Sequence, residues 1–338
     1  MQERDYSIDA MRAVGLICVV LAHINPPMTL MQIRCFDVPL MLFVSGLVYS
    51  GRNPDFSGRY LLKRVLRLVL PTWLFLMFLF PACLLPAKLG IIPYFSWNEI
   101  LSTFMLRDQP ESIGYVWIIR IFIIISICTP FWLVLAKKLS KVWHYTILFI
   151  SLIGIQELLI NVLKGYDEIW IIKDWVLYVF GYSSAFVLGL NLKGASKKSN
   201  IEMLLFLAMV LCLVILYYHH ETGFWFVPNN YKYPPHCYFL VWGAFMSVLL
   251  WTTKDVWSGL TNNRFLIWMG QNTIWIYLWH IPFLKPVVML LSRVSWVIRY
   301  VLIFGLAILI FGIQYNLVKY ILNKYPHKKL SLLSYLVG

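Results

Sequence analysis

An arginine and a histidine bracket the first apolar segment of the chain. His23 follows Arg12 by eleven positions, and the ten residues between them carry no charge. On an α-helix, eleven steps of about 100° return to within about 20° of the starting direction, so the two side chains would share one face. Asp9 lies three residues before Arg12 and can pair with it. Ionisable residues inside a membrane are costly, so a functional role is their default interpretation.

His23 has the chemistry of a general base. A neutral imidazole accepts a proton from an alcohol near neutral pH, which is what acyl transfer to a hydroxyl requires. The alternative is a histidine that only hydrogen-bonds a neighbouring helix, and the presence of Arg12 and Asp9 favours the functional role. We predict that His23 is catalytic and that Arg12 and Asp9 orient the helix face that carries it.

Basic residues cluster before the third apolar segment, in a predicted cytoplasmic loop. Lys63, Arg64 and Arg67 fall on consecutive turns, with the two arginines one turn apart. Guanidinium groups bind phosphates through paired hydrogen bonds, which suits a nucleotide-bearing donor that arrives from the cytosol. Contact with lipid head groups explains the cluster equally well from the sequence.

Four further residues are candidates for lining a substrate cavity. Ser45 interrupts an apolar run beside a glycine, where ordinary close packing of helices is the favoured alternative. Trp117 and Arg120 are three residues apart on one helix face, and Arg120 is predicted to snorkel outward or to pair with an outer carboxylate. His280 lies near the outer half of a late apolar segment. Cavity and structural roles are about equally supported for the last three.

Metal and disulfide sites are not favoured. His219, His220 and Glu221 are adjacent and would point to different faces of a helix, so a metal site is unlikely. The six cysteines show no CxxC spacing, and a bridge between Cys35 and Cys237 is a minor alternative to buried thiols.

Composition predicts a multi-pass membrane protein. The chain has 338 residues, of which 60% are hydrophobic and 13% charged, too few to coat a soluble domain. The net charge of +14 comes from short clusters between apolar runs, so nucleic acid is a poor partner. The expected architecture is all-α and forms one domain over 1–338. Apolar runs predict ten spans, at 8–26, 35–51, 66–87, 113–135, 143–163, 173–192, 201–219, 236–252, 271–291 and 297–320.

The distribution of positive charge supports this count. With the N-terminus in the cytoplasm, inner segments hold 18 Lys and Arg and outer segments hold 9. This bias predicts that both termini are cytoplasmic. The outer segments 88–112 and 220–235 mix aromatic residues with carboxylates and amides, as a carbohydrate-binding surface does. Anchoring of Trp and Tyr at the membrane interface is the stronger alternative for these aromatics.

Together, these motifs resemble the acyltransferase 3 family of integral-membrane acyltransferases. The resemblance runs in order along 4–283. It is carried by SIDAMRAVGLICVVLAH as the opening motif, FDVPLMLFVSG as the second-span motif, KRVLRLVLP as the RxxR element, YVWII as the tryptophan motif and IWIYLWHIPF as the late Tyr-x-x-His motif.

The resemblance implies an O-acyltransferase of the bacterial cytoplasmic membrane. It would move an acetyl or other acyl group from cytosolic acetyl-CoA, without a metal, to a hydroxyl of a cell-surface or lipid-linked carbohydrate. His23 would be the catalytic histidine, Arg12 its motif partner, and Arg64 and Arg67 ligands of the CoA phosphates. No SGNH-type extension follows the last predicted span, so the membrane domain itself is expected to handle the acceptor.

A transporter or flippase of a polysaccharide or lipid-linked sugar is the competing class. Buried charges and broken helices are compatible with it. The absence of an inverted repeat of the Arg and His pattern weakly disfavours it. The sequence leaves open the acceptor, the acyl group, the oligomeric state, and the choice between direct transfer and an acyl-histidine intermediate.

Overall fold

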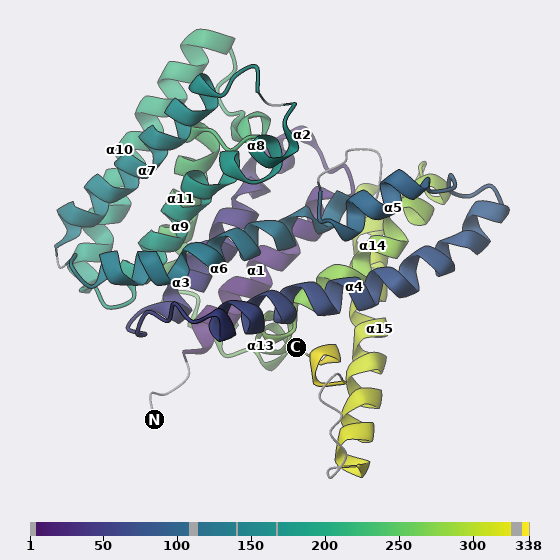
Figure 1. The fold of residues 1–338 in the computed structure, drawn as a ribbon. Helices are drawn as coiled ribbons and strands as arrows, with labels where there is room; N and C mark the ends of the chain where they lie inside the picture. Colours follow the sequence, from purple (N-terminus) through teal and green to yellow (C-terminus); the bar gives the residue numbers. More distant parts are fainter. Residues whose placement is uncertain (1–4, 108–113, 140, 167, 326–332, 338) are drawn as a thin grey trace. The chain divides into compact units, whose positions relative to one another are not determined.

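The computed structural model describes residues 5–107, 114–139, 141–166, 168–325 and 333–337 (Figure 1). The described residues form helices and no strand, which confirms the all-α prediction. The chain divides into two compact units. Unit 1 comprises Met1–Val19, Pro27–Leu61 and Ile121–Gly270, and unit 2 comprises Val20–Pro26, Leu62–Arg120 and Gln271–Gly338. The predicted single domain stays a prediction.

Unit 1 contains most of the helices. They are most of α1 (Tyr6–Ala22), α2 (Met28–Ile33), η1 (Arg34–Phe36), α3 (Asp37–Tyr49), most of α6 (Trp117–Ala136), α7 (Val142–Val162), α8 (Trp170–Asp174), η3 (Val176–Tyr178), α9 (Val179–Leu192), α10 (Lys197–Thr222), η4 (Pro228–Tyr231), α11 (Cys237–Thr252), α12 (Ser258–Thr261) and α13 (Arg264–Gln271).

Close packing of α3 against α9 forms the centre of unit 1. A Cβ atom added to Gly46 would lie 2.1 Å from the carbonyl oxygen of Phe186, and one added to Gly189 would lie 2.0 Å from that of Phe43. Neither position has room for a larger side chain, because the atoms it would meet are backbone. The two glycines therefore let these apolar helices approach backbone to backbone.

Unit 2 is built around long helices interrupted by proline. Its elements are most of α4 (Gly58–Lys88), α5 (Trp97–Phe104), η2 (Gly114–Val116), α14 (Thr273–Leu290), α15 (Trp296–Lys324) and η5 (Leu333–Leu336). Helix α14 packs along α15, and α4 carries three prolines within its length.

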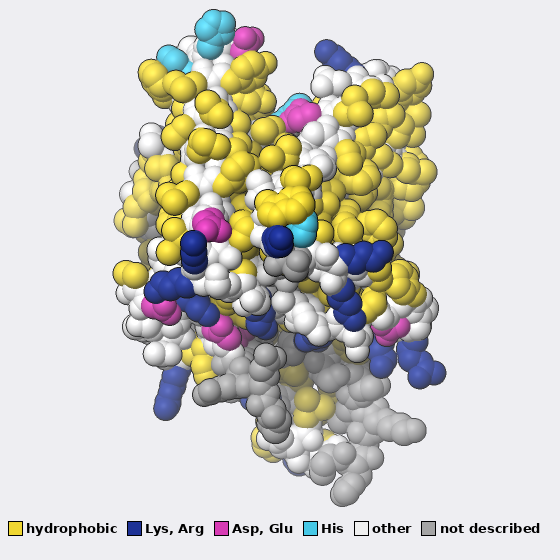
Figure 2. All heavy atoms as spheres, turned by 90° about the vertical axis from the view of Figure 1, so that its left-hand side faces the viewer, with side chains coloured by type: hydrophobic (Ala, Val, Ile, Leu, Met, Phe, Trp, Pro, Cys, Tyr) yellow, Lys and Arg dark blue, Asp and Glu magenta, His cyan; other side chains and the backbone are white. Residues whose placement is uncertain are grey.

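Eight helical segments among the described residues are long and apolar enough to cross a membrane. Two of them, Met28–Tyr49 and Trp170–Leu192, join consecutive helices. Helices α1 and α11 are shorter, with 17 and 16 residues, and coincide with the other two predicted spans. Figure 2 shows hydrophobic side chains over much of the visible surface, as expected for a protein in lipid. The count of ten and the cytoplasmic termini stay predictions.

Two helix boundaries differ from those predicted. Helix α1 ends at Ala22 rather than at residue 26, because Asn25 has a positive φ of 52° and two prolines follow it. Helix α4 begins at Gly58 rather than at residue 66, so the basic cluster before the third span lies on a helix and not in a loop. The apolar runs alone did not reveal this extension, since its first turns are polar.

Candidate active site

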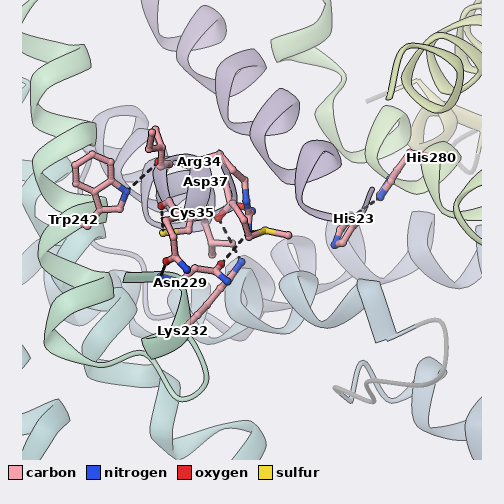
Figure 3. Close-up of polar contacts among 12 residues, drawn as sticks. His23, Arg34, Cys35, Asp37, Asn229, Lys232, Trp242 and His280 are labelled. Carbon is pink, nitrogen blue, oxygen red and sulfur yellow. Dashed lines mark hydrogen bonds and ion pairs between the residues drawn. The ribbon is translucent and has the colours of Figure 1, made fainter. Parts of the chain in front are cut away.

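Two histidines far apart in the sequence meet in unit 2. His23 lies in the turn after α1, and His280 lies on α14. Nδ1 of His23 is 3.0 Å from Nε2 of His280, and the two side chains point toward each other in Figure 3. The rings are stacked, with 14° between their planes. His280 is completely buried, whereas His23 is partly exposed. We call these two residues the histidine pair.

The contacts of His280 select one arrangement of protons for the neutral pair. Nδ1 of His280 contacts the carbonyl oxygen of Tyr277, which can only accept, so this nitrogen carries the hydrogen. Nε2 of His280 is then an acceptor, and Nδ1 of His23 donates to it. The basic lone pair of His23 consequently lies on Nε2. This proton assignment follows from the hydrogen-bond network, as it does in other histidine sites.

Aromatic and amide contacts fix the orientation of α14 around His280. The indole of Trp279 donates to Oε1 of Gln314 on α15 at 2.7 Å, and the Gln314 amide donates to the Leu336 carbonyl at 2.7 Å. Phe75 and Phe78 of α4 meet the Trp279 ring edge to face. These contacts tie α14 to its neighbours one residue before His280, so the imidazole is held by packed helices.

Tyr115 completes the immediate surroundings of His23. The two ring centroids are 4.5 Å apart in an edge arrangement. Tyr115 lies in η2, within the YVWII stretch that the sequence comparison singled out for its tryptophan. Sequence analysis missed this tyrosine, although the motif that contains it was the available signal.

Arg12 and Asp9 form the predicted ion pair in unit 1. Nη1 of Arg12 is 3.2 Å from Oδ1 of Asp9, and Asp9 is buried. A Cβ atom on Gly270 of α13 would lie 1.8 Å from the Asp9 carbonyl oxygen, so α1 and α13 pack backbone to backbone here. The pair therefore sits where α1 packs closely on α13, and its orienting role stays a prediction.

The basic cluster lies on the first turns of α4. Lys63 and Arg67 are exposed and four positions apart, which places them on one helix face, whereas Arg64 is partly buried. The predicted spacing of the two arginines by one turn is thus confirmed. Whether these residues bind phosphate stays a prediction.

Arg120 is buried inside unit 2. Its side chain is completely buried, and Nη1 donates to the carbonyl oxygen of Leu106 at 2.8 Å. The prediction that it snorkels outward is therefore wrong, because a buried backbone acceptor holds the guanidinium inside unit 2. Trp117, one turn earlier, is also buried. The outer carboxylates Asp108 and Glu111 lie outside the described residues.

Ser45 lies on α3 in unit 1. Its hydroxyl donates to the Met41 carbonyl oxygen one turn earlier at 3.0 Å. The adjacent Gly46 packs against α9, and the Pro39 ring lies 2.5 Å from where a Cβ of Gly243 would stand. In this motif the structure shows helix packing, the alternative favoured from the sequence. Pro39 falls in the first turn of α3, where a missing N–H interrupts the helix least.

A buried ion cluster in unit 1 escaped the sequence analysis. Asp37 accepts from Nη1 of Arg34 and lies 3.6 Å, through Oδ1, from Nζ of Lys232 (Figure 3). Asn229 accepts from Nη2 of Arg34 at 3.1 Å, and its own N–H donates to Gln32 at 2.8 Å. The side chains of the three charged residues are 1–6% exposed. We call Arg34, Asp37 and Lys232 the ion cluster.

The sequence offered one signal for the ion cluster. Arg34 and Asp37 have the three-residue spacing of a helical ion pair. They lie at the start of the predicted span 35–51, where charged residues are common and do not by themselves indicate a buried site. Lys232 lies almost 200 positions away, and only folding brings it there. Burial lowers the pKa of Lys232, and the nearby Asp37 carboxylate opposes that shift.

Cysteine and aromatic expectations have different outcomes. Cys35 and Cys237 are both free thiols, and Cys35 donates to the Gln32 carbonyl, so the alternative of a bridge between them is wrong.

In the segment after α10, Phe224 and Trp225 are largely exposed, and the Trp225 ring stacks on His219. These rings are available for either a sugar or the membrane interface.

Fold and site together define a multi-pass, all-helical membrane protein in which a buried imidazole contacts a partly exposed one. The family model described as "Acyltransferase domain", Acyl_transf_3, matches residues 5–314. The chain belongs to the acyltransferase 3 family, as the order of its motifs predicted. A search of curated proteins and one of solved structures each gave no match. Family membership indicates membrane acyl transfer as the class of activity.

Proposed function

We propose that this protein transfers an acetyl group from cytosolic acetyl-CoA to a hydroxyl of a cell-surface or lipid-linked carbohydrate, in the bacterial cytoplasmic membrane. The observation that carries the proposal is the histidine pair. The hydrogen bonds of this pair place the basic lone pair of His23 on Nε2. Membership of the family indicates that the reaction is acyl transfer.

In the direct route His23 acts as general base. Nε2 takes the proton from the acceptor hydroxyl while the hydroxyl oxygen attacks the thioester carbonyl carbon. The new carbon–oxygen bond forms, the carbon–sulfur bond breaks, and the imidazolium returns the proton to the CoA thiolate. His280 supports this step by accepting from Nδ1 of His23, so that the positive charge can spread over two rings.

The covalent route uses the same atoms in a different order. Nε2 of His23 attacks the thioester carbon, and CoA leaves as its carbon–sulfur bond breaks. The Nδ1 proton of His23 can pass to Nε2 of His280, 3.0 Å away, which keeps the acyl-imidazole neutral. The acceptor hydroxyl then attacks this acyl group and the carbon–nitrogen bond breaks. His280 returns its proton to Nδ1 of His23, and the proton of the hydroxyl passes to the CoA thiolate.

The basic face of α4 is the proposed anchor for the donor. Lys63 and Arg67 are exposed on one helix face, with Arg64 beside them, and such groups match the phosphates of CoA. Contact with lipid head groups is the competing role. The exposed aromatic residues after α10, and Trp97 on α5, are candidates for stacking on the acceptor sugar. Trp117 and Arg120 are buried, and in this proposal they stabilise the packing around the site rather than contact the substrate.

The decisive experiment is transfer of radiolabelled acetyl from acetyl-CoA to membrane glycans. Purified full-length protein in lipid nanodiscs is mixed with bacterial membranes, and the His23→Ala variant is compared with the unaltered protein. We expect loss of roughly 10²-fold or more of the transfer rate, the usual contribution of a general base, with CoA binding retained. The control His220→Ala removes a histidine whose side chain is 87% exposed and should transfer normally.

Four outcomes would separate the alternatives. Full transfer by a folded His23→Ala variant would rule out the proposed base. A protein that neither binds CoA nor labels a glycan would be better explained as a polysaccharide or lipid-linked sugar transporter. Label that remains on His23 after an acid quench without acceptor would select the covalent route, whereas unlabelled but active protein would select direct transfer.

A further inference from the structure

A cavity in unit 1 lies where five segments of the chain end or begin. Its volume is about 500 Å³. Its lining residues come from the segment after α3, the end of α6, the start of α7, the end of α9 and the first turn of α10. The polar residues among its lining include Arg52, Lys137, Asn191, Ser196 and Ser199. We call it the α10 cavity.

The α10 cavity is electropositive. Arg52 and Lys137 supply two cations, and the described residues that line it include no Asp or Glu. Neutral groups hold both cations. Nζ of Lys137 donates to Asn53 at 2.7 Å, and the Arg52 guanidinium carbon lies 5.2 Å from the ring centre of Tyr49. Their charges are therefore not cancelled by these contacts.

The start of α10 adds hydrogen-bond donors to the same cavity. Ser196 is the N-cap residue, and its hydroxyl accepts from the backbone N–H of Ser199 at 3.1 Å. The first N–H groups of a helix lack intrahelical acceptors, and the macrodipole of this 26-residue helix favours an anion at that end. Two side-chain cations and a helix start thus favour a phosphate group.

A second cavity continues from the first toward the apolar surface of unit 1. It runs between the starts of α7 and α10, has a volume of about 600 Å³, and shares Val142 and Ser199 with the α10 cavity. Trp143 and Ile147 line it, and more than half of each side chain is exposed. The rest of its lining is Val142, Lys141, Thr146, Ser199 and Glu202, and Glu202 lies 4.0 Å from Nζ of Lys198. Trp143, Ile147 and Val142 give this mixed lining an apolar stretch against which an acyl chain can lie.

From these two connected cavities we propose a binding site for an anionic phospholipid. Its phosphate lies between Arg52, Lys137 and the first turn of α10, and one acyl chain follows the groove past Trp143. This site belongs to unit 1 and is separate from the histidine pair and the α4 arginines of unit 2. A soluble phosphate ester also offers an anionic phosphate but has no chain for the groove, so the two ligands can be distinguished.

Native mass spectrometry of the full-length protein tests the lipid assignment. The protein in detergent is titrated with phosphatidylglycerol and, separately, with zwitterionic phosphatidylcholine. We expect one phosphatidylglycerol to be retained, and about tenfold or greater weakening in an Arg52→Gln, Lys137→Gln double variant, which loses two charge-assisted contacts. Lys319→Gln removes a charge on α15 of unit 2 and should bind as the unaltered protein does.

Two further variants keep the test decisive if the double variant fails to fold. Ala136→Phe fills the α10 cavity without changing charge and should also weaken phosphatidylglycerol binding. Trp143→Ala opens the groove and should weaken it severalfold. Equal retention of the lipid by all variants would overturn the proposal. Calorimetric binding of glycerol 3-phosphate as tight as that of the lipid, unchanged by Trp143→Ala, would assign the cavity to soluble phosphate esters instead.

Discussion

The ion cluster of unit 1 is buried, whereas the histidine pair of unit 2 joins a buried and a partly exposed imidazole, and the chemistry of the two groups differs. In the ion cluster, Asp37 contacts two cations, and amide groups satisfy further hydrogen bonds. The histidine pair joins two imidazoles and a backbone carbonyl. The ion cluster consists of charged groups, whereas the histidine pair consists of imidazoles whose ring nitrogens can donate or accept hydrogen bonds.

This comparison separates a role in stability from a role in chemistry. Loss of any one member of the ion cluster should strongly destabilise the fold, because the other members would remain charged and buried without compensation. Substitution within a neutral imidazole pair should reduce the stability of the fold less. The proton arrangement of the pair, however, depends on both rings. We therefore expect activity to be sensitive in unit 2 and folding to be sensitive in unit 1.

The largest effect is expected from His280. His280→Leu removes the acceptor for Nδ1 of His23, so the acyl transfer rate should fall by about 10²-fold or more while the protein stays folded. His280→Gln keeps an amide oxygen that can accept this hydrogen bond and should recover part of the rate. The measurement is the pH profile of kcat/KM for both variants. Equal losses with an unchanged pH profile would show that His280 only fills space.

The next effect tests the ion cluster. Asp37→Asn leaves the Arg34 and Lys232 cations without their carboxylate, and we expect a loss of about 3–5 kcal/mol of unfolding free energy. Thermal unfolding in detergent measures this loss. The rate of acyl transfer per folded molecule should change little, and a large fall in that rate with normal stability would place the ion cluster in the reaction.

A smaller effect concerns pH and Lys232. Burial lowers the pKa of Lys232, so the folded protein holds this proton less tightly than the unfolded chain does. The resulting cost is fully present below the folded pKa and is relieved as pH rises toward the unfolded value. Stability should therefore gain a positive slope at alkaline pH, which Lys232→Met should remove. An identical slope in this variant would contradict the assignment.

The smallest effect is expected from Asn229. Asn229→Ala removes the amide oxygen that accepts from Nη2 of Arg34 at 3.1 Å. A hydrogen bond to a charged group contributes about 1.5–3 kcal/mol, and retention of the Asp37 partner should keep the loss near the lower end. The measurement is again the unfolding temperature. A loss larger than that of Asp37→Asn would reverse the order of importance within the ion cluster.

The local features of the site were predictable from local patterns. The spacing of Asp9 and Arg12 predicted their ion pair, and the spacing of Arg64 and Arg67 predicted their separation by one helical turn. The expectation that Arg120 snorkels outward failed because a helical pattern gives no acceptor for a guanidinium, whereas the fold supplied the Leu106 carbonyl. The end of α1 before His23 depended on the backbone of Asn25 and on the prolines after it.

The sequence by itself determined that this is an all-helical membrane protein of the acyltransferase 3 family, because hydropathy, helical spacing and motif order are local properties of the chain. It also identified His23 and His280 as separate candidates. Only the tertiary structure decided that these two imidazoles meet and that Lys232 joins Arg34 and Asp37. The physical reason is that burial and hydrogen-bond partners come from residues 257 and almost 200 positions apart, which no local pattern encodes.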